Sequence, residues 1–542
     1  MTTSNTPLTT LALAATRWPS ADIFKTPIID NHKNPIAPHI IGYGTITYKE
    51  FYSYVETSAR YWYARLSEDD IPTGSIVGYC SRGGSYSDYV HINRLSKAGY
   101  IPQTFSLLPH SIEVIQALLK KSGAKALLYE ERYFDAARSL MGLGLKVYPT
   151  FSNLPTTDCQ ASGALPNLPE PQPNDIYRIL HSSISTSGMP KLVPYTFRFV
   201  ETLLRRAAAI TSTHSPPYVT SGSACHVPGF SLLIDVMHNG SCIIQQTCVL
   251  PEIEELKSMV NLGGLTQAFM STPTLCRFLK ASRTDPEFLN LLKALNTISY
   301  GGAGFPSDDL EWARLNMLNL VDVYGSSECG LHVMRSGSNR VGTAEHAHLR
   351  PVQLLKEDGT PFTRYRFAPV TKSTGDRDSD GVCRPPHPSL LGGQEDFHTG
   401  DLFEEVKPGE YIHRGRIDDW IQMANAGKCD ARSIEDDANS VCMDIELFSD
   451  CLVAGSNQPS PVLIVEASVS DTDEEKHLRQ DIFKRIVDSD SHKKRFPHEQ
   501  IASENSIIIV PPGPMVRTAT KGNIRRKAVE EALDDRIRAV FS

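Results

Sequence analysis

The segment between residues 75 and 130 alternates apolar runs with a helical pattern, and this alternation constrains the fold more than any other feature of the sequence. Residues 75–80 and 125–129 have the composition of short buried strands. Between them, apolar residues recur with helical spacing over 111–122, and Gly123 is placed to end that helix. A helix followed closely by an apolar strand is typical of sheets that are covered by helices. The sequence therefore predicts an α/β fold.

The pattern changes further along the chain and indicates more than one domain. Further strands are expected at residues 176–180, 242–245, 297–300 and 321–324, with helices between them. Gly, Pro and Asp dominate residues 358–396, as in irregular regions with short antiparallel strands. Beyond this region we expect a strand pair at 411–423, strands at 462–469 and 507–510, and helices at 474–487 and 526–541. The prediction is a large N-terminal domain of layered α/β subdomains with a β-rich part, residues 1–416, and a small C-terminal α+β domain, residues 417–542.

Composition excludes several classes of protein. A chain of 542 residues that is 40% hydrophobic and 21% charged can bury a large core. Its 54 Lys and Arg face 62 Asp and Glu, and no basic block is interleaved with aromatic residues, so a nucleic-acid partner is not expected. We expect no membrane association and a cytoplasmic location, because no apolar run approaches the ~20 residues that span a bilayer and the N-terminus lacks a secretory leader. The 11 cysteines contain no CxxC pair, which suits reduced core residues better than a zinc site.

The strand expected at 176–180 runs directly into the turn SISTSGMPK, residues 183–191. Small hydroxylated side chains and a glycine allow backbone N–H groups to converge on one point, which suits phosphate oxygens. The hydroxyls add donors and the last residue a positive charge; the residues concerned are Ser183, Ser185, Thr186, Ser187, Gly188 and Lys191. A serine-rich surface turn explains this segment equally well on its own. It is not a Walker A loop, because GxxxxGK[ST] is absent.

A second motif, DVYGSSE, covers residues 322–328. A strand ends at Tyr324, Gly325 permits a sharp turn, and Glu328 lies beyond it. A carboxylate at the carboxyl end of a sheet strand is well placed to hold Mg²⁺ on a nucleotide phosphate. Taken alone, an exposed or helix-capping glutamate is the simpler interpretation.

Two further polar motifs lie in the last third of the chain. The sequence Thr399-Gly-Asp401 is followed by Arg416, where Asp401 can accept both hydroxyls of a ribose and Arg416 can reach the ribose or a phosphate. The segment RTATKGNIRR, residues 517–526, is a basic loop ahead of the last predicted helix. An ordinary turn and a solvated charge cluster are the simpler interpretations when each motif is taken alone.

In this order and spacing, the four motifs resemble those of the adenylate-forming superfamily of acyl-CoA synthetases, luciferases and nonribosomal-peptide-synthetase adenylation domains. The chain is most similar to fungal adenylate-forming reductases and related synthetase-like enzymes around residues 180–183, 225–226 and 418–421. The resemblance covers nearly the whole chain, including residues 46–48, 96–100 and 300–303. It implies that a carboxylic acid attacks the α-phosphate of ATP to give an acyl-adenylate and pyrophosphate. The thiol of CoA, or of a carrier-protein phosphopantetheine, then takes the acyl group.

The resemblance also assigns roles to residues of this sequence. The turn 183–191 would hold the leaving phosphates, with Thr186 and Glu328 on Mg²⁺ and Ser327 at the α-phosphate. Asp401 would hold the ribose. The adenine and the rest of the nucleotide would be bound by Gly301, Gly302, Ala303, Asp322, Val323, Tyr324, Gly325 and Arg416. Lys521 would be the catalytic lysine, and Asp418 the hinge about which a mobile C-terminal domain swings between the two half-reactions.

His226 completes the set of candidate catalytic residues. It occupies the place where amino-acid-activating members of the superfamily carry an aspartate for the substrate ammonium. A histidine does not offer that fixed negative charge. We therefore expect an aromatic or other non-amino carboxylic acid as substrate; a core or gating histidine is the other interpretation of this residue.

Two departures from the family pattern motivate other hypotheses. Ile184 and Ser185 stand where Ser and Gly are expected, and a serine at a left-handed glycine position costs roughly 1 kcal/mol. The sequence Lys521-Gly-Asn places the lysine earlier than the common Ser-Gly-Lys, although some fungal members write Lys-Gly-Thr there. A degenerate member that acts as a nucleotide-responsive binding or scaffold subunit is thus the second hypothesis. A reductase domain separated from its other modules is the third, since the sequence has no GxGxxG after a strand and no GxSxG.

Overall fold

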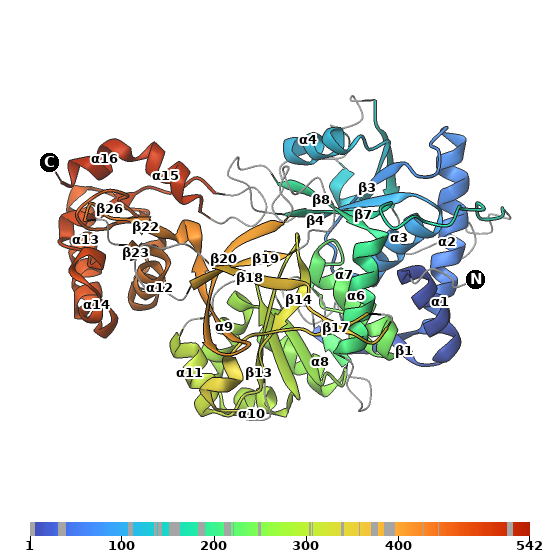
Figure 1. Ribbon diagram of the computed structural model, residues 1–542, viewed down its shortest axis with the longest axis horizontal. Coiled ribbons are helices and arrows are strands. Elements are labelled where there is room, and N and C mark those ends of the chain that lie inside the picture. The colour runs from blue at the N-terminus through green and yellow to red at the C-terminus, as the bar shows by residue number, and fades with distance from the viewer. Residues whose placement is uncertain are drawn as a thin grey trace.

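The computed structural model describes most of the chain: residues 6–30, 39–106, 112–134, 138, 144–150, 163–182, 190–210, 218–220, 222–247, 251–302, 305, 307–337, 341–356, 358–369, 378–383, 396–425, 428–442, 444–517 and 524–541. Figure 1 shows a large N-terminal body and a smaller C-terminal domain. The predicted α/β class and the division into a large and a small domain are confirmed.

A six-stranded sheet forms the first layer of the N-terminal body, in the order β6-β5-β3-β4-β7-β8. All neighbouring pairs are parallel except the hairpin of β7 and β8. Its strands are buried apolar runs, as parallel sheets require when helices cover both faces. They are β3 (Ile76–Ser81), β4 (Ile101–Ser106), β5 (Ala126–Glu130), β6 (Lys146–Thr150), β7 (Ile176–Ser182) and β8 (Lys191–Thr196).

A nine-stranded sheet forms the second layer, in the order β15-β14-β13-β12-β11-β9-β10-β1-β2. Its centre is parallel, and antiparallel strands close it at both edges. The strands are β1 (Asp22–Asp30), β2 (His39–Thr47), β9 (Tyr218–Thr220), β10 (Cys242–Ile244), β11 (Gln267–Ser271), β12 (Thr297–Gly301), β13 (Leu320–Ser326), β14 (Gly330–Arg335) and β15 (Arg350–Pro351).

Helices α6 and α7 link the two sheets through one core. Buried side chains of β7, α6, α7 and β13, including Leu180, Leu203, Phe230 and Val323, belong to a single hydrophobic cluster. Helix α7 ends at Gly240, where φ is +68° and a Cβ would lie 2.8 Å from the ring of Trp18, so glycine is required twice over. The helices of this domain are α1 (Pro7–Arg17), α2 (Tyr48–Glu68), α3 (Tyr86–Lys97), α4 (Ile112–Ser122), α6 (Phe197–Ala209), α7 (Val227–Asn239), α8 (Ile253–Asn261), α9 (Thr272–Ser282), α10 (Pro286–Ala294) and α11 (Ser307–Leu315).

The β-rich part follows and carries the chain to the C-terminal domain. It has a four-stranded antiparallel sheet and a separate strand pair. These strands are β16 (Leu354–Leu355), β17 (Pro361–Phe362), β18 (Tyr365–Pro369), β19 (Asp378–Cys383), β20 (Phe397–Lys407) and β21 (Glu410–Arg416).

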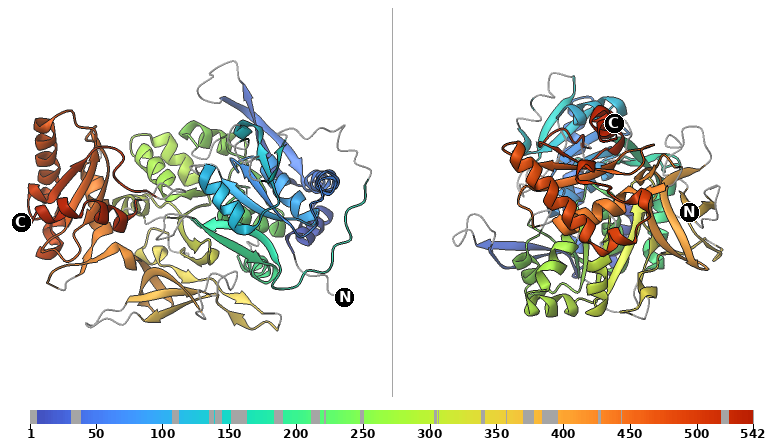
Figure 2. Two further views of the ribbon diagram at one scale, coloured as in Figure 1. Left: turned by 90° about the horizontal axis from the view of Figure 1, so that it is seen from above. Right: turned by 90° about the vertical axis from the view of Figure 1, so that its left-hand side faces the viewer.

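The C-terminal domain has its own hydrophobic cores. Both figures place it at one end of the molecule, away from α1 and α2 (Figures 1 and 2). A three-stranded sheet in the order β24-β25-β26 and the pair β22-β23 pack with its helices. Its elements are β22 (Trp420–Gln422), β23 (Lys428–Asp430), α12 (Ala431–Cys442), β24 (Phe448–Ala454), β25 (Val462–Ala467), α13 (Thr472–Asp488), α14 (Asp490–Lys494), β26 (Ile507–Val510), α15 (Arg526–Ala532) and α16 (Asp534–Ala539).

Two local predictions are wrong in this region. Residues 411–423 are not a strand pair, because β21 pairs with β20 and β22 pairs with β23, with a 3-10 turn over Ile417–Asp419 between them. The last predicted helix is two helices, because the backbone leaves the helical range at Leu533.

Seven described cysteines are free thiols, whereas Cys329 is disulfide-bonded, so the expectation of reduced cysteines is wrong at that position. None of the helices in the described residues is both long and apolar enough to cross a membrane.

Candidate active site

The base of the β7–β8 hairpin meets the turn after β13, so the first two motifs lie together. Tyr195 on β8 donates a 2.8 Å hydrogen bond from its hydroxyl to the backbone carbonyl of Ser327. The hydroxyl of Ser327 in turn donates to the carbonyl of His181 on β7, at 3.4 Å. Glu328 follows directly and is only 5% exposed. A carboxylate is thereby held beside the strand that leads into the Ser/Thr/Gly turn.

The turn itself lies mostly outside the described residues. This applies to Ser183, Ser185, Thr186, Ser187 and Gly188. Lys191 is described as the first residue of β8; it is exposed and lies opposite Ser182 in the register. The structure therefore describes the strands on both sides of the predicted phosphate-binding turn, and both strands contact Ser327.

Two glycines of the predicted nucleotide site are required by close backbone packing. A Cβ on Gly301, at the end of β12, would lie 2.5 Å from the carbonyl oxygen of Val323 on β13. A Cβ on Gly325 would overlap the carbonyl oxygen of Gly330. The next residue after β12, Gly302, has φ of +94°, which favours glycine. Ala303 lies outside the described residues.

Asp401 on β20 is held by side chains from two other strands. The Tyr324 hydroxyl donates to Asp401 Oδ2, and Arg416 Nη1 lies 3.2 Å from Oδ1. His413 Nε2 is 3.9 Å from the same oxygen. Tyr365 donates a 3.0 Å hydrogen bond to the Tyr324 hydroxyl. The predicted ribose-binding carboxylate thus lies beside the β13 motif, within a network formed by two tyrosines, an arginine and a histidine.

These contacts determine the protonation states of Asp401 and Tyr324. Burial alone would raise the pKa of Asp401, but His413, Arg416 and the Tyr324 hydroxyl outweigh it and hold this pKa below its usual range. Burial and the neighbouring Asp401 carboxylate raise the pKa of Tyr324 well above its usual value. Asp401 is therefore an anion that accepts hydrogen bonds, and Tyr324 is a neutral donor.

Asp322 is a second carboxyl in this region, and its pKa is shifted in the direction opposite to that of Asp401. Burial raises the pKa of Asp322 to about 6, and the neighbouring His413 only partly opposes this. Its backbone N–H donates to Ser336 Oγ at 2.7 Å.

Asp322→Asn should therefore change the pH dependence of stability. A carboxyl whose folded pKa is raised stabilises the fold when protonated, and that contribution is lost as the pH rises through about 6. The variant should gain about 1 kcal/mol over the natural protein when both are compared at pH 8 rather than pH 5. Denaturant unfolding at both pH values measures this difference. Asp308→Asn, an exposed change at the start of α11, is the control, and an equal gain in both variants would contradict the assignment to Asp322.

His226 lies at the N-cap of α7, half-buried and without a capping hydrogen bond from its side chain. The segment before it is fixed to the first sheet, because Thr104 on β4 donates to the carbonyl of Cys225 at 3.0 Å. Gly229 in the first turn allows close packing, since a Cβ there would lie 2.3 Å from the carbonyl of Ser223. His226 thus lies at a helix N-terminus, on an element separate from those that carry Glu328 and Asp401.

The last two motifs belong to the C-terminal domain and the segment that leads into it. Lys521 lies outside the described residues, but the ends of its loop are joined by a bridge between Arg517 and Ile524. Asp418 lies in the 3-10 turn Ile417–Asp419, and its side chain is outside the description.

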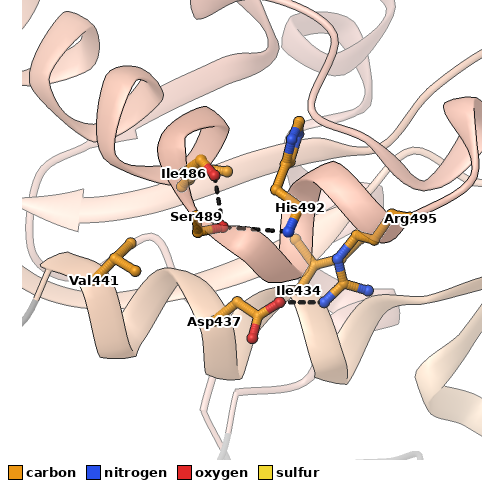
Figure 3. Close-up of a pocket in the computed structure, with 7 residues that line it drawn as sticks. All are labelled: Ile434, Asp437, Val441, Ile486, Ser489, His492 and Arg495. Atoms are coloured by element: carbon orange, nitrogen blue, oxygen red, sulfur yellow. Dashed lines mark hydrogen bonds and ion pairs between the residues drawn. The ribbon is translucent and has the colours of Figure 1, made fainter.

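A cavity of about 10 Å³ lies within the C-terminal domain and is drawn in Figure 3. That volume suits one water molecule. His492 and Arg495 are among the residues that line it, and Arg495 pairs there with Asp437. None of the predicted site residues that the structure describes lines this cavity. Its described walls are Ile434, Asp437, Val441, Ile486, Ser489, His492 and Arg495.

Comparison with known proteins identifies the family. The AMP-binding enzyme family matches residues 30–352, and the AMP-binding enzyme C-terminal domain matches residues 418–542. The chain therefore belongs to the AMP-binding enzyme family, as the resemblance of its motifs implied. It is an enzyme of the adenylate-forming type.

The curated relatives are fungal. The AMP-binding domain-containing enzyme iboA of Amanita muscaria is 30% identical over 521 residues, covering 92% of this chain and 95% of its own length. The adenylate-forming reductase stbB of Stachybotrys bisbyi is 24% identical over 481 residues, covering 83% of this chain. This match spans 41% of stbB, so the chain corresponds to less than half of that protein.

Solved structures share the fold at low identity. The anthranilate CoA ligase AuaEII, in complex with anthranoyl-AMP, superposes with a TM-score of 0.70 at 16% identity, over 98% of both chains. The A domain of a carboxylic acid reductase from Segniliparus rugosus, in complex with AMP and a carboxylic acid, also gives 0.70, at 14% identity over 99% of this chain and 94% of that one.

Sequence reasoning missed three residues of the site. Tyr365 and His413 complete the surroundings of Asp401, and Tyr195 fixes the Ser327 turn. The pairing of β20 with β21 brings His413 to Asp401, and no local pattern in the sequence predicts that register.

Proposed function

We propose that this protein activates a carboxylic acid with ATP to form an acyl-adenylate and then transfers the acyl group to a thiol of CoA or of a carrier protein. The observation that carries the proposal is the contact between the β7–β8 hairpin and the Ser327–Glu328 turn. It holds one carboxylate beside a loop whose residues suit phosphate binding. The substrate is an aromatic or other non-amino acid, because His226 stands at the helix N-terminus where an aspartate would pair with a substrate ammonium.

The residues present fit ATP and Mg²⁺. Mg²⁺ in proteins binds through one or two carboxylates together with substrate phosphates, and Glu328 is a single buried carboxylate next to the phosphate-binding turn. Thr186 is the second proposed protein ligand. When bound, the ion would neutralise charge on the phosphate oxygens. Asp401 would accept the ribose hydroxyls, Arg416 and Tyr324 would orient that carboxylate, and Lys521 would lie at the reacting carboxylate.

We place the domain boundary at 416/417 and the hinge at Asp418. The adjoining residues connect to both domains. Arg416 contacts Asp401 through its side chain, while its backbone N–H donates to Asp419 Oδ2 at 3.3 Å. Asp419 Oδ1 lies 3.5 Å from Arg526 of the C-terminal domain. Rotation at this segment would carry the Lys521 loop toward and away from the site between the two half-reactions.

Carboxylate-dependent exchange of pyrophosphate into ATP tests the first half-reaction. We expect exchange with at least one member of a panel of aromatic and aliphatic acids. A second arm adds CoA or a carrier protein bearing phosphopantetheine and measures thioester formation. No exchange by folded protein that binds ATP would overturn the proposal and leave the nucleotide-responsive subunit as the function to pursue.

A further inference from the structure

Arg178 is a buried arginine that has no acidic partner in the described part of the chain. It lies on β7 and is 3% exposed. Its Nη2 donates to the carbonyl of Ala224 and to Thr104 Oγ1, and its Nε has no hydrogen-bond partner among the described residues. Removal from water lowers the pKa of the guanidinium, which nevertheless stays charged.

The contrast with Arg206 shows that the fold can neutralise a buried arginine. Arg206 on α6 is also 3% exposed, and it pairs with Asp235 on α7. Buried charges are costly unless they are paired, and for Arg178 no carboxylate of the described residues supplies the pairing. An anion that binds beside Arg178 would supply it.

Arg178 lies next to the helix end that carries His226. Its guanidinium stacks on the ring of Phe230, 4.8 Å from the centroid. His226 is the N-cap of α7, and Phe230 follows four residues later at the start of that helix. The N-terminus of a 13-residue helix also carries partial positive charge. Two positive features thus meet at the 224–226 segment.

We propose that the substrate is a dicarboxylic acid, and that Arg178 is a specificity-determining residue which pairs with the carboxylate that is not activated. The proposal rests on the proposed function and narrows its substrate class. One carboxylate reacts at the Glu328 side of the site, while the other is held by the guanidinium and the α7 N-terminus. If Arg178 only holds the Ala224 carbonyl in place, the rate should not depend on the charge of the substrate.

Exchange assays with paired substrates separate these roles. The full chain is tested with succinate, glutarate, adipate and isophthalate, each beside its monoamide, which keeps the size and removes one charge. We expect at least a 10-fold higher kcat/KM for one diacid than for its monoamide. Arg178→Met should lower kcat/KM for that diacid about 100-fold, mainly through KM, and leave the monoamide within a few-fold. Arg178→Lys should retain part of the preference, since it keeps the charge.

Controls keep the outcome unambiguous. Arg277→Met removes a surface arginine that pairs with Glu252 and should change neither rate. Equal use of diacids and monoamides by the natural protein would overturn the proposal, as would a preference that survives in Arg178→Met. If Arg178→Met does not fold, the comparison of diacid with monoamide in the natural protein and in Arg178→Lys still tests the proposal. If no acid supports exchange, the proposed function fails, and melting curves with diacid alone decide on Arg178: a diacid-specific rise supports the proposal, and its absence overturns it.

Discussion

Glu328→Gln should lower the rate of ATP–pyrophosphate exchange by roughly 100- to 1,000-fold, the range seen when one electrostatic group at a reacting centre is removed. The substitution keeps the size of a side chain that is 5% exposed and removes the charge proposed to hold Mg²⁺. The loss should be in kcat, together with a higher Mg²⁺ concentration for half-maximal rate. Steady-state exchange over a Mg²⁺ titration measures both.

The matched control is Glu311→Gln, which removes an exposed carboxylate on α11 that pairs with Arg314. It should leave exchange unchanged. Thermal melting should show that both variants are folded. The assignment of Glu328 to the Mg²⁺ site would be wrong if Glu328→Gln exchanges within a few-fold of the natural protein and has the same Mg²⁺ requirement.

Asp401→Asn should raise the KM for ATP about 10- to 100-fold, because hydrogen bonds to a charged group contribute more than those between neutral groups. The amide cannot accept both ribose hydroxyls as a carboxylate does. It also leaves Arg416 and His413 without the charge that they face in the natural protein. Initial rates over a series of ATP concentrations, with direct measurement of ATP binding, separate KM from kcat.

Glu404→Gln is the control on the same strand, where the carboxylate pairs with Arg414 at the surface. Its KM for ATP should stay as in the natural protein. Should Asp401→Asn bind ATP as tightly as this control, the ribose assignment would be wrong, and the network of Asp401, Tyr324 and Arg416 would be structural only.

The sequence alone was sufficient for the features that depend on neighbouring residues. About ten neighbouring residues are enough to predict each of three features: the helix before β5, the strand that leads into the Ser/Thr/Gly turn, and the carboxylate just beyond β13. The order of four such motifs was enough to indicate the family, which the comparisons confirm. Local patterns gave the wrong result where strand pairing depends on a distant segment. The residues of β21 and β22 resemble one hairpin in the sequence, yet β21 pairs with β20 and β22 pairs with β23.

By itself the sequence determined the class of fold and the two-domain organisation, because apolar periodicity and turn residues act over short spans. Its four motifs indicated the type of enzyme through their resemblance to a known superfamily. Only the tertiary structure decided which polar groups meet. Tyr324 and Asp401 are 77 residues apart, and Tyr195 and Ser327 are 132 residues apart. It also decided that Arg206 finds Asp235 while Arg178 finds no acid in the described chain. The physical reason is that sheet order and helix packing set these distances, and the cost of a buried charge depends on what those distances leave beside it.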